Sequence, residues 1–378
     1  MAHPADPKPR GIHLATLGGV PVYIGWSWLL MAAVVVALIG PNIAASRPDL
    51  GALAYLVAVG YALILLVAVL AHEGAHAAVA RAFGHRVHQV VANLWGGHTA
   101  YDPSRARPGS MAAIAVAGPL TNGVLALVAL AFAPTSPPGV TSGLITATAF
   151  INGALMVFNL LPGLPLDGGQ LVEAAVWKAT GRKASARIAA GWSGRALVVA
   201  LIVIAIGIPM ARGDQGSMVT TIWIALIGVF MWSGASSSIQ QGRAMRLLDQ
   251  VDLRSVLEPV FVIPIDAPLT ALTDHHATPI VVDASGTPIG LVSLAAAGGV
   301  PVEVRGSTPI SAVLTRQPED WVVEATPGSE LLDIIRGFQT TRRPILAVVA
   351  GPTVLGIANA DRINAALASV DRAPRRRN

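Results

Sequence analysis

The chain has 378 residues, of which 12% are charged and 53% hydrophobic, and its mean hydropathy of +0.61 excludes a disordered chain and an ordinary cytosolic protein. It has no cysteine, so disulfides, thiolate zinc sites and cysteine nucleophiles are excluded, and His, Asp and Glu remain as the strong metal ligands. The net charge of +5 comes from short connecting segments and the Arg375–Arg377 tail, so no nucleic-acid partner is expected.

Six apolar stretches are long enough to cross a bilayer, because about 20 helical residues span a hydrocarbon core about 30 Å thick. In chain order they are Val22–Gly40, Leu50 to about Arg81, Gly109–Ala133, Gly139–Leu161, Ala196–Ala211 and Met218–Ile239. The fifth is short and must begin near Ala189. This puts Arg195 in its first turns, where a long side chain can reach the head groups. The first is expected to be retained, because no small-residue cleavage site follows it.

Basic residues are unevenly distributed over the connecting segments. They gather before the first span, after the second, after the fourth and after the sixth, whereas the alternate connections hold only Arg47 and Arg212. Segments rich in Lys and Arg stay on the cytosolic side. We therefore expect a multi-pass protein of the cell membrane, with residues 1–21 as a cytosolic tail and both termini cytosolic.

The sharpest motif, His72-Glu73-Gly74-Ala75-His76, lies near the cytosolic end of the second span. Four residues of α-helix turn by about 400°, so the two imidazoles share a face and can bind one Zn²⁺. Glu73 lies one step round, where its carboxylate can take a proton from water and pass it to a leaving amine. The alternative, that these side chains only hydrogen-bond between packed helices, would bury ionisable groups in the membrane at a cost.

A second polar motif, Asn159-Leu-Leu-Pro-Gly-Leu-Pro-Leu-Asp167-Gly-Gly, follows the fourth span. The second and fourth spans run toward the same side, so the topology brings Asp167 to the depth of the two histidines. Asp167 is therefore the best candidate for a third zinc ligand. Pro162 and Pro165 end the helix between the two polar residues. A plain helix end capped by Asp167 is the alternative.

Together these two motifs resemble the signatures of the site-2 protease family of intramembrane zinc metalloproteases, over roughly residues 22–241. The resemblance implies hydrolysis of peptide bonds within the bilayer. It implies one Zn²⁺ per chain held by His72, His76 and Asp167, water activated by Glu73, and Asn159 stabilising the oxyanion or the substrate strand. The substrate it implies is a membrane-spanning protein, such as an anti-sigma factor or similar signalling protein.

Two further segments of the membrane region carry candidates. Asn122, on the third span, can donate a hydrogen bond to a zinc ligand or simply bond to another helix, and Asn152 ranks below Asn159. Residues 87–101 predict a β-hairpin, which the family places near the active site and whose edge could pair with a substrate strand. Five further histidines are expected to be solvated and not to bind zinc: His85, His88, His98, His275 and His276.

From about Val251 the sequence is typical of a soluble α/β module. Pro279–Ser293 and Pro344–Ala358 form a weak repeat, each a strand, a glycine turn and a strand. The preceding residues repeat too, with Val260–Pro268 matching Trp321–Pro327. Helical stretches are expected next, at residues 269–275 and 329–339.

This repeat resembles a tandem pair of cystathionine-β-synthase-type (CBS) domains, which a subset of site-2 proteases carries. The resemblance implies a linker at 242–250, CBS motifs at 251–300 and 301–370, and a basic tail at 371–378. Many such pairs bind an adenine nucleotide through a Ser or Thr and a downstream Asp. The two copies here offer only Ser293 and Asp361, so nucleotide binding is uncertain, and a dimerising or substrate-gating module fits equally well.

The predicted fold is therefore an α-helical polytopic membrane domain with six transmembrane helices and a small β-hairpin near the active site, plus a cytosolic α/β tandem CBS domain. The predicted function is an intramembrane zinc endopeptidase for regulated intramembrane proteolysis, with a CBS pair that regulates access or forms a homodimer. The alternative is a CBS-regulated membrane transporter or channel, in which intramembrane His, Glu and Asp line an ion path. Stoichiometric zinc separates the two.

Overall fold

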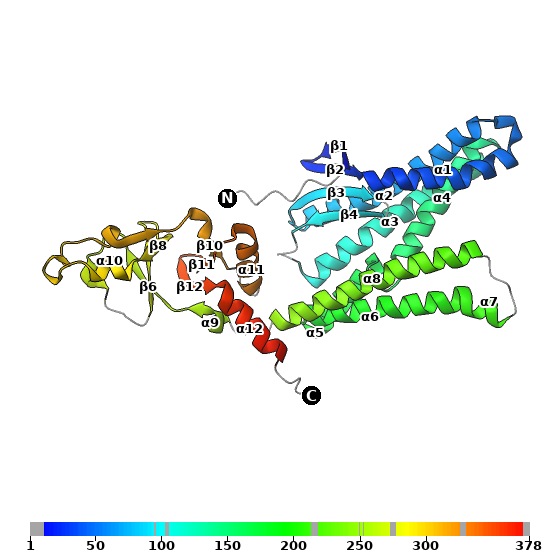
Figure 1. Ribbon diagram of the computed structural model, residues 1–378. Helices are drawn as coiled ribbons and strands as arrows, with labels where there is room; N and C mark the ends of the chain where they lie inside the picture. Colours follow the sequence, from blue (N-terminus) through cyan, green and yellow to red (C-terminus); the bar gives the residue numbers. More distant parts are fainter. Residues whose placement is uncertain are drawn as a thin grey trace. The chain divides into compact units, whose positions relative to one another are not determined.

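The computed structural model describes residues 11–93, 96–102, 106–212, 218–248, 250–251, 253–272, 277–325 and 330–372 (Figure 1). The chain divides into two compact units, Met1–Arg243 and Ala244–Asn378. Most of the predicted basic tail, and both His275 and His276, lie outside the described residues.

Long helices make up most of the first unit. They are α1 Trp26–Ser46, α2 Leu53–Ala82, α3 Pro108–Phe132, α4 Val140–Asn159, α5 Asp167–Thr180, α6 Lys183–Ile202, α7 Ile208–Ala211 and α8 Met218–Leu248. Within the described residues, six helical stretches are long and apolar enough to cross a membrane, as predicted. Helix α2, which carries the His72 motif, packs against α1, α3 and α4.

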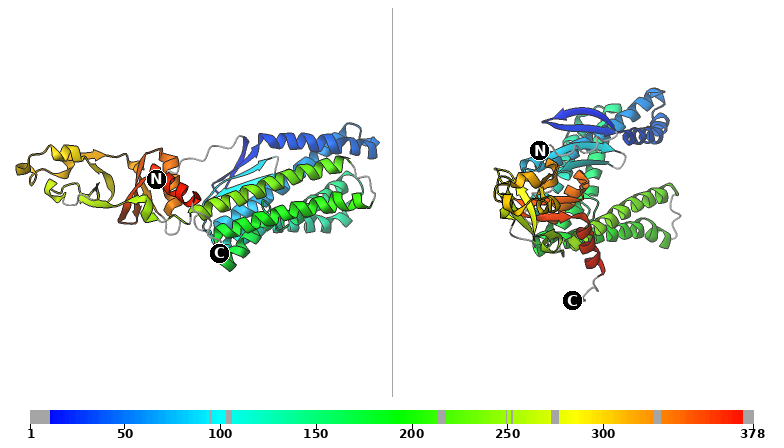
Figure 2. Two further views of the ribbon diagram at one scale, coloured as in Figure 1. Left: turned by 60° about the horizontal axis from the view of Figure 1, so that its bottom comes forward. Right: turned by 60° about the vertical axis from the view of Figure 1, so that its left-hand side comes forward.

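A four-stranded sheet lies at one end of these helices (Figure 2). Its strands are β1 Gly11–Leu17, β2 Val20–Gly25, β3 Val87–Asn93 and β4 Gly96–Tyr101, in the order β1-β2-β3-β4. Strands β2 and β3 are parallel, and the other two pairs are antiparallel. The predicted hairpin at 87–101 is thus present, as half of a larger sheet in which β4 is an edge strand.

The prediction was wrong about residues 11–25, which were taken as a tail and the start of a membrane helix. They form the β1–β2 hairpin, and the first span begins at Trp26. The physical reason is tertiary, because Val20 and Val22 are buried with Ala77 of α2 and Val90 of β3 in one apolar cluster. Val20 and Val22 lie in an apolar run directly before a long helix, and that run cannot reveal these partners.

The fifth span is also longer than predicted. It begins at Lys183 and continues through a π-helical segment, Val203–Gly207, to α7. Arg195 lies between the rings of Trp192 and Trp232, with its guanidinium carbon 4.9 and 4.8 Å from their centres. It also donates a hydrogen bond to Ser236 Oγ at 2.9 Å. Cation–π contacts and this hydrogen bond therefore compensate a charge that interrupts the apolar sequence.

The chain reverses between α4 and α5 at residues 160–166, where Pro162 and Pro165 prevent a continuous helix. The turn is fixed on α6, because Leu164 N donates to Ala190 O at 3.2 Å and Gly163 lies against the backbone of Gly194. A Cβ atom at Gly163 would be 2.5 Å from the Gly194 Cα. Helix α5 begins at Asp167, directly after this turn.

The second unit contains two four-stranded sheets with the same strand order. One sheet has the order β6-β7-β8-β9, from β6 Val260–Pro264, β7 Thr278–Val282, β8 Pro288–Val292 and β9 Leu314–Arg316. The other has the order β10-β11-β12-β5, from β10 Val322–Glu324, β11 Ile345–Ala350, β12 Thr353–Asn359 and β5 Leu257–Glu258. In each sheet the first two strands are parallel and the remaining pairs are antiparallel.

The two halves of this unit exchange their outer strands. Strand β5 lies before the first repeat but pairs with β12 of the second. Strand β9 lies before the second repeat but pairs with β8 of the first. The helices of the unit are α9 Leu253–Val256, α10 Leu294–Gly298, α11 Glu330–Thr341 and α12 Ala360–Arg372. Of the two repeated helical stretches, the second is α11 and the first has a short 3₁₀ turn at Leu269–Ala271 in its described part.

Candidate active site

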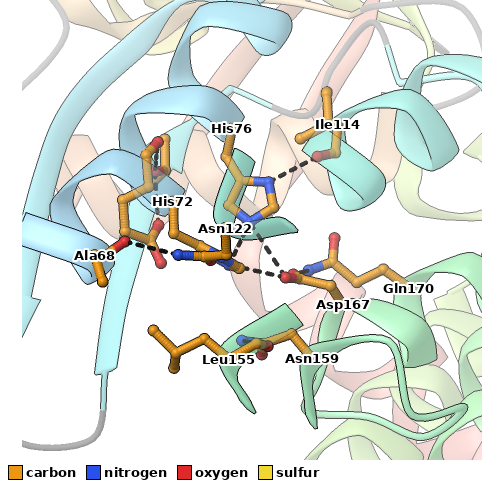
Figure 3. Close-up of polar contacts among 11 residues, drawn as sticks. Ala68, His72, His76, Ile114, Asn122, Leu155, Asn159, Asp167 and Gln170 are labelled. Atoms are coloured by element: carbon orange, nitrogen blue, oxygen red, sulfur yellow. Dashed lines mark hydrogen bonds and ion pairs between the residues drawn. The ribbon is translucent and has the colours of Figure 1, made fainter. Parts of the chain in front are cut away.

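The two histidines of the motif lie one helical turn apart on α2, and both are 7% exposed (Figure 3). Their Nε2 atoms are 3.1 Å apart. The Nδ1 atom of His76 lies 2.7 Å from Ile114 O, a backbone carbonyl of α3 that can only accept a hydrogen bond. His76 therefore carries its proton on Nδ1, which leaves the Nε2 lone pair directed at the site.

Asp167 meets this pair from the start of α5. Its Oδ2 atom lies 3.0 Å from His72 Nε2 and 3.3 Å from His76 Nε2. Gln170 Nε2 lies 3.3 Å from the other carboxylate oxygen, one turn along α5. The Asp167 side chain is 10% exposed, and the N-terminal position in a helix favours its negative charge. Side chains 95 positions apart in sequence thus converge on one point.

The three atoms fit a zinc ion. Two ligand atoms at about 2.0–2.1 Å from a tetrahedral Zn²⁺ are roughly 3.3 Å apart, close to the separations above. Gly118 of α3 leaves the necessary space, because a Cβ atom there would be 2.5 Å from His76 Nε2 and 2.6 Å from His72 Nε2. Two imidazoles and a carboxylate form a donor set that suits catalytic zinc and leaves one position for water or substrate.

Glu73 contacts the edge strand β4. Its Oε2 atom accepts a hydrogen bond from Thr99 Oγ1 of β4 at 2.8 Å. The Glu73 side chain is 6% exposed and packs so closely on Gly97 that a Cβ atom there would collide with it. His72, Glu73 and His76 offer ligand atoms within 4.8 Å of one another, so the carboxylate lies beside the metal position. The sequence did not single out Thr99 or Gly97, whereas Gly118 was expected to permit close packing.

A cavity of about 470 Å³ opens beside these residues. Its wall includes Asn159, His98, Tyr101 and Phe230. Asn159 donates its amide to Leu155 O of its own helix at 3.1 Å, and its predicted role in oxyanion or substrate binding stays a prediction. Burial raises the pKa of Tyr101, so its hydroxyl stays protonated at neutral pH.

Asn122 of α3 contacts His72, but not in the expected direction. It is fully buried, and its Oδ1 atom lies 2.5 Å from His72 Nδ1. Its amide nitrogen donates instead to Asn152 Oδ1 of α4 at 2.8 Å and to Ala68 O of α2 at 3.2 Å. Of the two expectations for Asn122, the hydrogen bonds to other helices are present, and donation to a zinc ligand is not: toward His72 it accepts, because its NH₂ group is used by α2 and α4.

The other predicted residues lie outside the cluster of His72, His76 and Asp167, although His98 lines the cavity. His98 is exposed on β4, as expected, whereas His85 is buried, packs against Tyr101 and has its Nδ1 3.0 Å from Asp102 O, contrary to expectation. In the second unit, Ser293 Oγ accepts from Ala296 N at the start of α10. Asp361 is exposed in the first turn of α12.

Comparison with known proteins agrees with this geometry. The chain is 31% identical over 369 residues to Rip3 of Mycobacterium tuberculosis, which is named as a zinc metalloprotease, and the alignment covers 92% of this chain and 90% of Rip3. The chain belongs to the site-2 protease (M50) family. The model of peptidase family M50 matches residues 138–204, which include α4 and the segment up to Asp167. The protein is therefore a zinc metalloprotease.

Two further members of this group are similar to the chain. The zinc metalloprotease sll0528 of Synechocystis is 29% identical over 257 residues, covering 66% of this chain and 65% of that protein. The solved site-2 protease from Methanocaldococcus jannaschii is 21% identical, with a TM-score of 0.44, and the match covers 61% of this chain and 95% of that one. Family membership and six apolar helices together indicate a multi-pass membrane protein.

Proposed function

We propose that this site-2 protease family member is an intramembrane zinc endopeptidase that cleaves membrane-spanning segments of other proteins. One observation carries the proposal: Asp167 lies 3.0 and 3.3 Å from the Nε2 atoms of a histidine pair that occupies a helix long and apolar enough to span a bilayer. Such a group of ionisable side chains is costly in a membrane helix unless it serves a function.

The proposed metal ligands are His72, His76 and Asp167. Zinc bound there would activate water and polarise the scissile carbonyl. Glu73, held at Oε2 by Thr99, keeps Oε1 available to take the proton from the attacking water. When the C–N bond breaks, Glu73 returns that proton to the leaving amine nitrogen. We assign to Asn159, which lines the cavity, the binding of the developing oxyanion or the substrate backbone.

We propose that the substrate is bound as an extended strand on β4. This strand is at the edge of the sheet, and its residues Gly97 and Thr99 line the cavity beside Glu73. An edge strand offers free backbone groups to a partner, whereas a helical substrate hides the peptide bond that must be attacked. The substrate class is a membrane-spanning protein, such as an anti-sigma factor or similar signalling protein.

The distribution of basic residues supports an orientation with both termini cytosolic, so that the motif lies near the cytosolic surface and water has a short path to it. For the second unit we propose a CBS pair. Its support is the two sheets with the same strand order and their exchanged outer strands. The pair would regulate access or form a homodimer, and adenine-nucleotide binding through Ser293 or Asp361 is a separate question for direct titration.

Glu73→Gln tests the proposal with a membrane-embedded reporter substrate in proteoliposomes. The variant should keep one zinc per chain and lose cleavage by about 10²–10⁴-fold, the range ascribed to general acid–base catalysis. Asp167→Ala should instead lower the zinc content. Continued turnover by the first variant would remove Glu73 from the mechanism, and a wild-type protein free of zinc would favour a transporter or channel.

A further inference from the structure

Asn152 lies on α4, is 2% exposed, and forms its hydrogen bonds with Asn122 and Thr148 and not with the histidines or Asp167. Its two hydrogen bonds run along the helix and to α3. The amide nitrogen donates to Thr148 O at 2.9 Å, and the amide oxygen accepts from Asn122 Nδ2 at 2.8 Å. A polar amide buried this deeply in a helical layer must satisfy its hydrogen-bonding groups, and both are satisfied here.

The directions of these bonds are fixed by their ends. Thr148 O is a backbone carbonyl and can only accept, so the NH₂ group of Asn152 must face it and the oxygen must face Asn122. Asn122 then presents its own NH₂ group to Asn152 Oδ1, and also to Ala68 O, which again can only accept. Only Asn122 Oδ1 remains for His72.

The directions of these hydrogen bonds determine which nitrogen of His72 carries the proton. An acceptor at 2.5 Å requires His72 Nδ1 to carry the proton, so the Nε2 lone pair faces Asp167 and the metal position. An asparagine amide has two nearly isosteric orientations. A flipped Asn122 would present NH₂ to Nδ1, favour the proton on Nε2, and oppose metal binding. His76 needs no such control, because it bonds directly to a backbone carbonyl.

We propose that Asn152 is a positioning residue that fixes the amide orientation of Asn122 and, through it, the metal-binding tautomer of His72. The proposal rests on the proposed zinc site. Residues that hold a metal-binding histidine from behind typically change metal affinity by 10- to 100-fold when they are replaced. Asn152 contacts Asn122 and not the histidine itself, and Ala68 O would still hold Asn122 in its absence. We therefore expect a loss of zinc affinity of about tenfold, the lower end of this range.

The test is the zinc dissociation constant of the purified full-length chain in detergent, measured with Zn²⁺ alone by competition with a chromophoric chelator. Asn152→Leu, which keeps a similar volume, should bind zinc about tenfold more weakly than wild type. Thr148→Val is the matched control: its hydroxyl bonds to Leu144 O on the same helix, outside the chain from Asn152 to His72, and its loss should leave zinc affinity unchanged. Thermal unfolding of the metal-free forms reports any difference in folding.

A double-mutant cycle separates positioning from simple helix packing. If Asn152 acts through Asn122, Asn152→Leu should weaken zinc binding no further in a chain that already has Asn122→Leu. Additive losses, equal losses in Asn152→Leu and Thr148→Val, or a wild-type dissociation constant in Asn152→Leu would each overturn the inference. If Asn152→Leu does not fold, Asn152→Ser, whose shorter side chain does not reach Asn122, replaces it. Absence of zinc from the wild type would overturn the proposed function itself.

Discussion

Each catalytic or metal-binding side chain of the α2 motif is held in one orientation by a hydrogen bond to a particular partner. Ile114 O fixes the orientation of His76, and Asn122 Oδ1 that of His72. Thr99 holds one oxygen of Glu73, and glycine at 97 and 118 leaves the room that the carboxylate and the imidazoles require. Preorganisation of this kind avoids reorganisation during the reaction, so small changes at these positions should have large effects on activity.

Thr99→Val should slow cleavage without removing zinc. The substitution keeps the side-chain volume but removes the hydroxyl that donates to Glu73 Oε2. A hydrogen bond to a charged group contributes about 1.5–3 kcal/mol, so kcat should fall roughly 10- to 100-fold. Thr99→Ser keeps the hydroxyl and should retain most of the wild-type rate. Steady-state kinetics on a membrane reporter would measure the fall in kcat. An unchanged kcat with a raised KM would assign Thr99 to substrate binding only.

Gly118→Ala should abolish zinc binding. The new methyl group would lie 2.5–2.6 Å from the two Nε2 atoms and occupy the space that the metal needs. Gly74→Ala, within the histidine motif itself, is the control, because a Cβ atom there meets nothing within 4 Å. Zinc analysis of both purified variants makes the comparison. Full zinc occupancy in Gly118→Ala would mean that α3 does not border the metal position.

At the scale of elements, the turn between α4 and α5 decides where the third ligand lies. Its prolines end α4, and its contact with α6 fixes the start of α5. The edge strand β4 brings Thr99 to Glu73 of α2. The site is therefore assembled by helices α2 and α3, the start of α5 and strand β4.

Gly163→Ala should displace the turn and weaken zinc binding. A Cβ atom at this position would be 2.5 Å from the backbone of Gly194, which cannot move aside as a flexible side chain could. Overpacking of this kind costs about 1–3 kcal/mol. Gly153→Ala in α4 is a suitable control, since its Cβ atom would make an ordinary 4.0 Å contact with Ala126. The unfolding temperature and the zinc affinity should both fall in Gly163→Ala and stay unchanged in Gly153→Ala.

At the scale of the whole molecule, the site is contained within the first compact unit. All the residues to which we assign a role in zinc binding or catalysis lie between positions 72 and 167, and the internal repeat lies after position 250. The second unit has its own apolar clusters, including one formed by Val256, Ile334, Val348 and Ile363. Chemistry and any regulation are thus assigned to separate parts of the chain.

Removal of the residues after Gln250 should leave zinc binding intact and change the cleavage rate or the oligomeric state. The reason is that the ligand contacts described above all lie within the first unit. Zinc analysis, reporter cleavage and light scattering of the detergent-solubilised chain measure the three quantities. Loss of zinc would show that the second unit supports the site, and no change in rate or assembly would leave it without a regulatory role.

The sequence by itself determined the features that depend on local periodicity. Four-residue spacing on a helix puts His72 and His76 on one face, long apolar stretches give six spans, and alternating residues at 87–101 give a hairpin. Prolines in the Asn159–Asp167 segment end a helix before the carboxylate. These outcomes follow from the chain's own geometry, so neighbouring residues suffice to predict them.

Only the tertiary structure decided which distant groups meet and in which direction they bond. Residues 11–25 become strands because they find β3 and α2 as partners, and Thr99 reaches Glu73 because β4 lies at the sheet edge. His72 and Asn122 are 50 residues apart, and the orientation of that amide depends on carbonyls of two other helices. Such contacts depend on how whole elements pack, which no short window of sequence contains.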